Sequence, residues 1–155
     1  MKIKELMTRD CITAKPDMTL NDAAHLLWKH DCGSLPVVDE QRNVVGMVTD
    51  RDICMCAYHK GSSLKQLNVA DAMSKQVLTC AEDDEISTAE RAMSEAQVRR
   101  IPVVDREGRL RGLLCLAKIA RASSDGNGGK EISKKKVGET LAAICQPTAG
   151  ARAEI

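Results

Sequence analysis

The strongest constraint on the fold of this chain is an internal repeat that fills most of its 155 residues. Residues 3–53 align with residues 69–119 without a gap, at a constant offset of 66 positions. Ten of the 51 aligned pairs are identical, where unrelated sequences of this composition would share roughly three. A repeat of this kind is one supersecondary unit copied once, and two copies can bury their apolar faces on each other.

Each copy has the pattern of a β-α-β-β-α unit preceded by a short turn, which predicts an α+β fold. In the first copy we expect the turn at 3–7, strands at 11–13, 35–38 and 44–48, a helix after Thr19 and a second helix at 51–60. In the second copy we expect the turn at 69–73, strands at 77–79, 101–104 and 110–114, and helices at 86–96 and from about 116 to 123.

Capping residues support these helices. Thr19, followed by Asp22, is expected to cap the first helix, Asp50 to cap the next helix, and Gly61 to end it. In the first helix, one face is expected to be formed by Ala23, Ala24, Leu27 and His30.

The motif Gly46-Met47-Val48-Thr49-Asp50-Arg51-Asp52 ends the first copy and places a hydroxyl and a carboxylate three residues apart. If a helix begins there, its first turn offers free N–H groups and a positive dipole end to a phosphate. Thr49 can add a hydroxyl donor, and Asp52 can accept hydrogen bonds from a ribose diol. The motif therefore indicates a nucleotide site, although Thr and Asp at a helix start can also be plain capping residues.

Composition limits the other function classes. The net charge is +1 and the aromatic residues are Trp28 and Tyr58, so neither a broad basic surface nor stacking platforms for nucleic acid are expected. The chain has seven cysteines and no long apolar stretch, from which we expect a cytoplasmic protein with reduced thiols and no membrane segment. Trp28 is expected in the core, in helix packing or on a dimer surface.

The cysteines and histidines allow a further interpretation. Cys54, Cys56 and His59 could suggest a metal site, but positions 54 and 56 point about 200° apart on a helix. Cys11, Cys32 and Cys80 could come together as a redox switch. No catalytic constellation is found, so we expect no enzyme activity.

The C-terminal part differs in composition. Residues 123–136 are polar, Gly-rich and end in a lysine run, which predicts a flexible linker. A short helix is expected at 137–145 with Val137, Leu141 and Ile144 on one face, followed by disordered residues. We therefore divide the chain into a first repeat at 1–61, a second at 62–122, and a linker and tail at 123–155.

Taken in order, the motifs resemble those of paired CBS domains, the cystathionine-beta-synthase-type modules (Bateman modules) that bind adenosine nucleotides. The resemblance covers residue 2 to about residue 121, and the length is similar to that of stand-alone two-repeat members. The motifs that carry it are Leu6-Met7-Thr8, Leu35-Pro36-Val37-Val38-Asp39 and Gly46–Asp52, with Ala72-Met73-Ser74, Arg99–Asp105 and Gly112 in the second copy.

The resemblance implies a pseudo-twofold disc in which two repeats pack sheet to sheet, and a homodimer of such discs. It implies that Asp52 holds the ribose and Thr49 meets the α-phosphate, with Arg51 on the same turn. Arg100 of the second copy would reach the phosphates. The resemblance further implies an adenine pocket lined by Thr13, Ala14, Lys15, Pro16, Leu35 and Pro36.

The second copy departs from the motif, because Cys115 replaces the Thr and Lys118 replaces the Asp. A lysine cannot accept a hydrogen bond from a ribose hydroxyl, so one competent cleft is expected. The favoured function is a non-catalytic sensor of AMP, ADP or ATP, with no tightly bound cofactor and an unknown protein partner. The alternatives are a ligand-free dimeric scaffold in a stress response and a thiol- or metal-responsive sensor.

Overall fold

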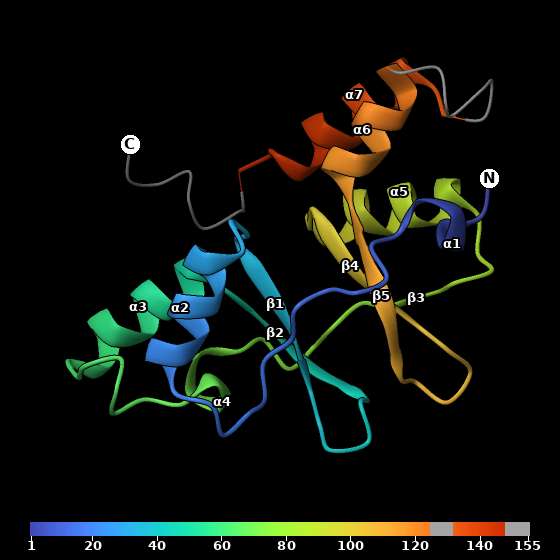
Figure 1. Cartoon of the computed structure of the whole chain (residues 1–155). Helices are drawn as coiled ribbons and strands as arrows, with labels where there is room; N and C mark the ends of the chain where they lie inside the picture. The colour runs from blue at the N-terminus through green and yellow to red at the C-terminus, as the bar shows by residue number, and fades with distance from the viewer. Residues whose placement is uncertain (125–131, 148–155) are drawn as a thin grey trace. The chain divides into compact units, whose positions relative to one another are not determined.

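The computed structural model describes residues 1–124 and 132–147 and forms two compact units. Unit 1 contains Met1–Arg9, Leu78–Val103 and the described residues from Arg111 onward, and unit 2 contains Asp10–Val77 and Val104–Leu110. Both units mix helices and strands (Figure 1). The predicted α+β class is therefore confirmed.

Unit 2 is built on the first copy of the repeat. Its elements are helix α2 (Leu20–Lys29), strands β1 (Ser34–Val38) and β2 (Val44–Thr49), helix α3 (Asp50–Lys60) and the short helix α4 (Val69–Ala72). Strands β1 and β2 are antiparallel, and Ala14 adds a parallel bridge to Val37. The core of unit 2 is aliphatic and includes Leu20, Leu35, Val37, Val48 and Ile53.

Unit 1 is built on the second copy. Its elements are the short helix α1 (Ile3–Leu6), strand β3 (Cys80–Ala81), helix α5 (Ile86–Ala96), strands β4 (Arg100–Val104) and β5 (Leu110–Cys115) except their end residues Val104 and Leu110, and helices α6 (Leu116–Ser124) and α7 (Lys134–Ile144). The sheet order is β3-β4-β5, and α7 packs against α5 and α6 (Figure 1). Its core includes Met93, Ile101, Leu114 and Ile119.

The leading helices are exchanged between the copies. Helix α1 precedes the first copy but belongs to unit 1, where the Ile3 N–H donates to the Asp84 carbonyl at 2.9 Å. Helix α4 precedes the second copy but belongs to unit 2, where the Val69 N–H donates to the Met18 carbonyl at 2.8 Å. Each compact unit therefore joins the body of one copy to the leading helix of the other, whereas the division at residues 61 and 122 follows the order of the sequence.

The structure corrects several local predictions in the repeat. Thr49, and not Asp50, is the N-cap of α3. The first strand of each copy lies one to three residues later than expected, at Ala14 and at Cys80–Ala81, because these residues make the bridges. His30 is exposed at the end of α2, beyond the face that Ala23 and Leu27 bury.

The C-terminal prediction also needs correction. Lys134, Lys135 and Lys136 form the first turn of α7 and are not a flexible run. The buried face of α7 carries Val137 and Thr140, whereas Leu141 is exposed. Residues 125–131 of the predicted linker and residues 148–155 of the predicted tail lie outside the described residues.

Candidate functional site

The motif residues Thr49 and Asp52 lie where β2 passes into α3, and they form a reciprocal capping box. The backbone N–H of Asp52 donates to Thr49 Oγ1 at 3.0 Å, and the backbone N–H of Thr49 donates to Asp52 Oδ2 at 2.9 Å. This arrangement satisfies two N–H groups at the start of the helix. The capping box therefore accounts for the positions of both side chains without a bound ligand, as the capping interpretation predicts.

Capping leaves part of each side chain available. Thr49 Oγ1 serves as an acceptor in the box, so its own O–H can still donate to an anion. Within the described residues Asp52 Oδ1 accepts no hydrogen bond, and a carboxylate oxygen can accept from a hydroxyl. Arg51 lies exposed on the same turn. One donor, one acceptor and one cation are thus close together at the N-terminus of an 11-residue helix.

The segment before α2 lies along β1. The Ala14 N–H donates to the Pro36 carbonyl, and the Val38 N–H donates to the Ala14 carbonyl, both at 2.9 Å. Ala14 and Pro36 are both fully buried, and Thr13 is half-buried. The structure therefore brings the predicted adenine-lining segment next to the X-Pro step of β1.

Lys15 and Pro16 continue this segment. Lys15 is exposed and forms an ion pair with Glu40 at 2.9 Å, and its hydrogen bond to that carboxylate raises the pKa of the lysine. The Pro16 carbonyl accepts the N–H of Ala70 at 2.9 Å. These contacts hold the end of the segment against the rest of unit 2.

Strand register decides which predicted side chains share a face. Ser34 lies opposite Thr49, Leu35 opposite Val48, and Pro36 opposite Met47. Because side chains alternate along a strand, Ser34, Pro36 and Thr49 share one face. Leu35 lies on the other face, where it is fully buried in the aliphatic core.

Ser34 is a residue that sequence reasoning missed. It is 5 % exposed, and its hydroxyl has no hydrogen-bond partner among the described residues. A buried unpaired hydroxyl is uncommon in native proteins and calls for an explanation. Because Ser34 lies across from Thr49, a ligand bound there could donate a hydrogen bond to this hydroxyl or accept one from it. No sequence signal distinguishes a serine of this kind from other serines.

The glycine of the motif serves packing. A Cβ on Gly46 would lie 2.6 Å from Met73 Sδ and 3.0 Å from the Ser74 carbonyl oxygen. The reason is that Ser74 pairs with Met47 across β2. Gly112 has the same role in unit 1, where a Cβ would lie 2.6 Å from the Thr8 carbonyl oxygen.

The second copy of the site has different chemistry. Lys118 Nζ donates to the Met7 carbonyl at 3.5 Å. The Cys115 thiol is hydrogen-bonded to Arg100, and burial raises its pKa although the cations Arg100, Lys118 and Arg121 oppose the shift. Arg100 thus lies in unit 1 beside Cys115, and its predicted phosphate contact stays a prediction.

Metal sites and membrane-spanning helices are two other features that a chain of this kind could carry. In residues 1–124 and 132–147 no group of three or more His, Cys, Asp or Glu is placed to hold a metal ion. None of the helices in these ranges combines the length and the apolar character needed to cross a bilayer.

Comparison with known sequences places both copies in one family. The CBS domain model matches residues 3–57 and again residues 69–125. The uncharacterized protein MK0525 of Methanopyrus kandleri is 31 % identical over 119 residues, which are 77 % of this chain and 61 % of that protein. An inosine-5'-monophosphate dehydrogenase of Methanocaldococcus jannaschii is 33 % identical over 147 residues, which are 94 % of this chain but 28 % of the enzyme.

Solved structures show the same fold. CBSX2, solved in complex with AMP, is 28 % identical with a TM-score of 0.72, covering 81 % of this chain and 98 % of its own; the protein is from Arabidopsis thaliana. The CBS domain pair of MJ0100, solved with 5'-methylthioadenosine and S-adenosyl-L-methionine, is 27 % identical with a TM-score of 0.71, covering 81 % and 97 %.

Hypoxic Response Protein I, solved with two coordinated zinc ions, is 28 % identical with a TM-score of 0.72, covering 78 % of this chain and 98 % of its own. The repeat, the two units and these matches agree. The chain belongs to the CBS-domain family and carries a pair of CBS domains.

Proposed function

We propose that this chain is a regulatory, non-catalytic module that binds an adenosine-containing ligand, AMP, ADP or ATP, at the site formed by Thr49 and Asp52. The observation that carries the proposal is the capping box, which fixes both side chains and still leaves the Thr49 hydroxyl proton and Asp52 Oδ1 for a ligand. The buried hydroxyl of Ser34 lies opposite Thr49 and meets no hydrogen-bond partner within residues 1–124 and 132–147, which supports the proposal.

The roles of the two residues follow from their chemistry. A phosphate at the N-terminus of α3 is favoured by the helix dipole and accepts a hydrogen bond from the Thr49 hydroxyl. A ribose hydroxyl donates to Asp52 Oδ1. The adenosine ligands of CBSX2 and of MJ0100 make this ligand class the first to test.

A regulatory effect requires two states that the ligand binds with different affinity. The bound ligand stabilises one of these states of the module, and that state changes the activity of a partner. No covalent bond of the ligand is broken or formed. A homodimer, a cytoplasmic location and an unidentified protein partner remain part of this proposal, and sedimentation equilibrium tests the dimer.

The test is isothermal titration and thermal unfolding with AMP, ADP, ATP, S-adenosylmethionine and 5'-methylthioadenosine. A ligand at 100 times its dissociation constant stabilises the folded state by about 2.7 kcal/mol, which raises the melting temperature by roughly 2–4 °C per kcal/mol. If none of the five ligands binds or shifts unfolding, the proposal is wrong. Chromatography of the nucleotide after incubation with the protein tests whether the ligand is converted to a product. We expect to recover the nucleotide unchanged.

A further inference from the structure

The motif that ends the first copy has different side chains in the second copy. Three pairs of positions correspond through the repeat offset of 66, namely Ser34 and Arg100, Thr49 and Cys115, and Asp52 and Lys118. In unit 2, the two hydroxyl residues lie opposite each other in neighbouring strands. Unit 1 therefore has a guanidinium, a thiol and an ammonium group where unit 2 has two hydroxyls and a carboxylate.

The structure brings the three replacing side chains together. Arg100 begins β4, Cys115 ends β5, and the Cys115 thiol is hydrogen-bonded to Arg100. Lys118 lies on the first turn of α6, which follows β5 directly (Figure 1). Its Nζ donates to the Met7 carbonyl at 3.5 Å. The ends of two strands and the start of one helix thus place two cations near the same thiol.

A third cation, Arg121, lies one turn further along α6. Burial raises the pKa of the Cys115 thiol, and the charges of Arg100, Lys118 and Arg121 all act in the opposite direction. The three cations, here called the basic cluster, are therefore close enough to act on one group. Within residues 1–124 and 132–147, none of them forms an ion pair with a carboxylate.

The basic cluster is unfavourable without an anion. Arg100 and Lys118 are half-buried, and cations that lose hydration beside other cations raise the free energy of the folded state. The positive end of the nine-residue helix α6 adds to this potential. The thiol and the Met7 carbonyl at 3.5 Å are weak acceptors for these cations. An oxyanion would accept shorter, charge-assisted hydrogen bonds from them.

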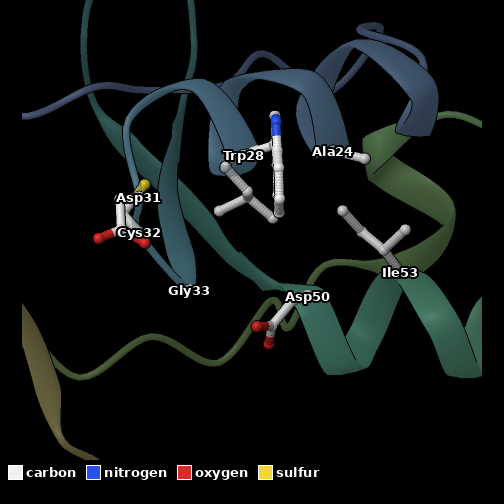
Figure 2. Close-up of a pocket in the computed structure, with 8 residues that line it drawn as sticks. Ala24, Trp28, Asp31, Cys32, Gly33, Asp50 and Ile53 are labelled. Carbon is white, nitrogen blue, oxygen red and sulfur yellow. The ribbon is translucent and has the colours of Figure 1, made fainter.

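The same end of unit 2 has the opposite charge. Figure 2 shows a pocket at the start of α3 that Asp31 and Asp50 line, and Asp52 follows on the first turn of this helix. No lysine or arginine is among the described residues that line the pocket, and Trp28, which also lines it, is 86 % exposed. The basic cluster is therefore a property of the second copy and not of the repeat as such.

We propose that the basic cluster is a site for a free phosphoryl anion, such as inorganic phosphate or pyrophosphate, which binds without a nucleoside. A guanidinium group can bind two phosphoryl oxygens at once, and a lysine adds a compact charge. Lys118 cannot accept a hydrogen bond from a ribose hydroxyl, so the position that would recognise a nucleoside lacks the chemistry for it. All residues of the site belong to unit 1, and the proposal does not rest on the nucleotide site of unit 2.

The test measures alkylation of Cys115 by iodoacetamide at pH 8, followed by mass spectrometry of peptides. This reagent is neutral, so the basic cluster does not attract it. A bound anion offsets the cation charges that favour the thiolate, which is the reactive form, so we expect pyrophosphate to slow the reaction of Cys115 by about fivefold or more. Cys145, exposed at the end of α7, is the control and should keep its rate.

Other additives identify what the cluster recognises. Phosphate and AMP should slow the reaction of Cys115 to a similar extent, whereas adenosine, or sodium chloride of equal ionic strength, should have no comparable effect. No slowing with roughly 10 mM pyrophosphate, or the same slowing with sodium chloride, would overturn the anion site. Slowing by adenosine, or a much stronger effect of AMP than of phosphate, would show that a nucleoside is recognised, and the proposal would be wrong.

Substitutions test the residues of the cluster. Lys118→Gln and Arg100→Gln should each raise the pyrophosphate concentration for half-maximal protection by about tenfold, relative to the unmodified chain. Each variant is compared with itself in the absence of anion, because the substitution also changes the reactivity of Cys115. Lys134→Gln removes an exposed lysine of α7 and should leave the protection unchanged. Unchanged protection in both cluster variants would contradict the assignment.

A second thiol shows whether each variant is folded. Cys80 lies in the core of unit 1, so it should stay slow to react wherever unit 1 is intact. If Cys80 reacts fast in Arg100→Gln, Arg121→Gln replaces that variant, because Arg121 is exposed. This substitution should also weaken the protection by pyrophosphate, and full protection in a folded Arg121→Gln protein would exclude Arg121 from the site.

Discussion

Thr49 and Asp52 hydrogen-bond each other in both directions across the first turn of α3, at 3.0 and 2.9 Å. This pairing fixes the positions of both side chains before any ligand arrives. Interactions that are already organised reduce the entropy lost on binding. The same residues therefore contribute to helix stability and to the proposed nucleotide site, and an experiment must separate the two contributions.

Asp52→Asn is expected to weaken binding of the nucleotide at least tenfold and to lower the free energy of unfolding by about 0.5–1 kcal/mol. The matched control is Asp71→Asn, because the Asn68 N–H donates to Asp71 Oδ2 at 2.9 Å in the same kind of capping box on α4. We expect this control to lose similar stability and to keep its affinity, as measured by urea unfolding and calorimetric titration. Equal loss of affinity in both variants would assign the effect to capping alone.

Ser34→Ala removes the buried hydroxyl that has no hydrogen-bond partner in the described part of the chain. A buried unsatisfied polar group costs about 1–3 kcal/mol, so the ligand-free variant should unfold at an unchanged or higher urea concentration. Ser94→Ala is the control, since that hydroxyl donates to the Glu90 carbonyl, and it should gain no stability. If Ser34 meets a ligand, the stabilised variant binds nucleotide more weakly; a Ser34→Ala protein that loses more than about 1 kcal/mol contradicts this assignment.

The sequence predicted most of the elements because each depends on local signals. Runs that contain valine marked β1, β2 and β4. Gly61 marked the end of α3, where it takes a left-handed φ of 63°. Helix α5 begins and ends where its apolar spacing indicated. The cap of α3 was assigned to the wrong residue because Thr49, Asp50 and Asp52 are all good capping residues, and only the backbone geometry decides among them.

Other features depend on contacts between distant segments, which local patterns do not encode. Met7 and Met73 occupy equivalent positions in the repeat, so the sequence alone does not say which copy each leading helix contacts. The unpaired Ser34 looks like any serine at the start of a strand. Helix α7 buries Thr140 and exposes Leu141, because its orientation is set by the polar contacts of Lys136 and by packing on α5 and α6.

Gly46→Ala is expected to destabilise unit 2 by about 1–3 kcal/mol, because an added Cβ in a packed site forces neighbours apart. The Met73 side chain can move, but the Ser74 carbonyl at 3.0 Å is backbone that pairs with β2. Gly138→Ala is the control on α7, where a Cβ meets nothing within 4 Å, and it should gain roughly 0.5–1 kcal/mol. Urea unfolding measures both, and a neutral Gly46→Ala would exclude the close approach as the reason for this glycine.

Cys80 and Cys54 should differ strongly in reactivity. Burial, and secondarily the charge of Asp84, raises the pKa of Cys80 to about 11, whereas Cys54 is exposed on α3. The thiolate is the reactive form, and at pH 8 a thiol with this pKa is ionised in roughly one molecule in a thousand. Iodoacetamide at pH 8, followed by mass spectrometry of peptides, should therefore modify Cys54 well before Cys80. Adding urea should remove the difference, because unfolding returns Cys80 to its ordinary pKa. Equal rates in the folded protein would mean that Cys80 is not held in the core of unit 1, and they would favour the redox interpretation for this thiol.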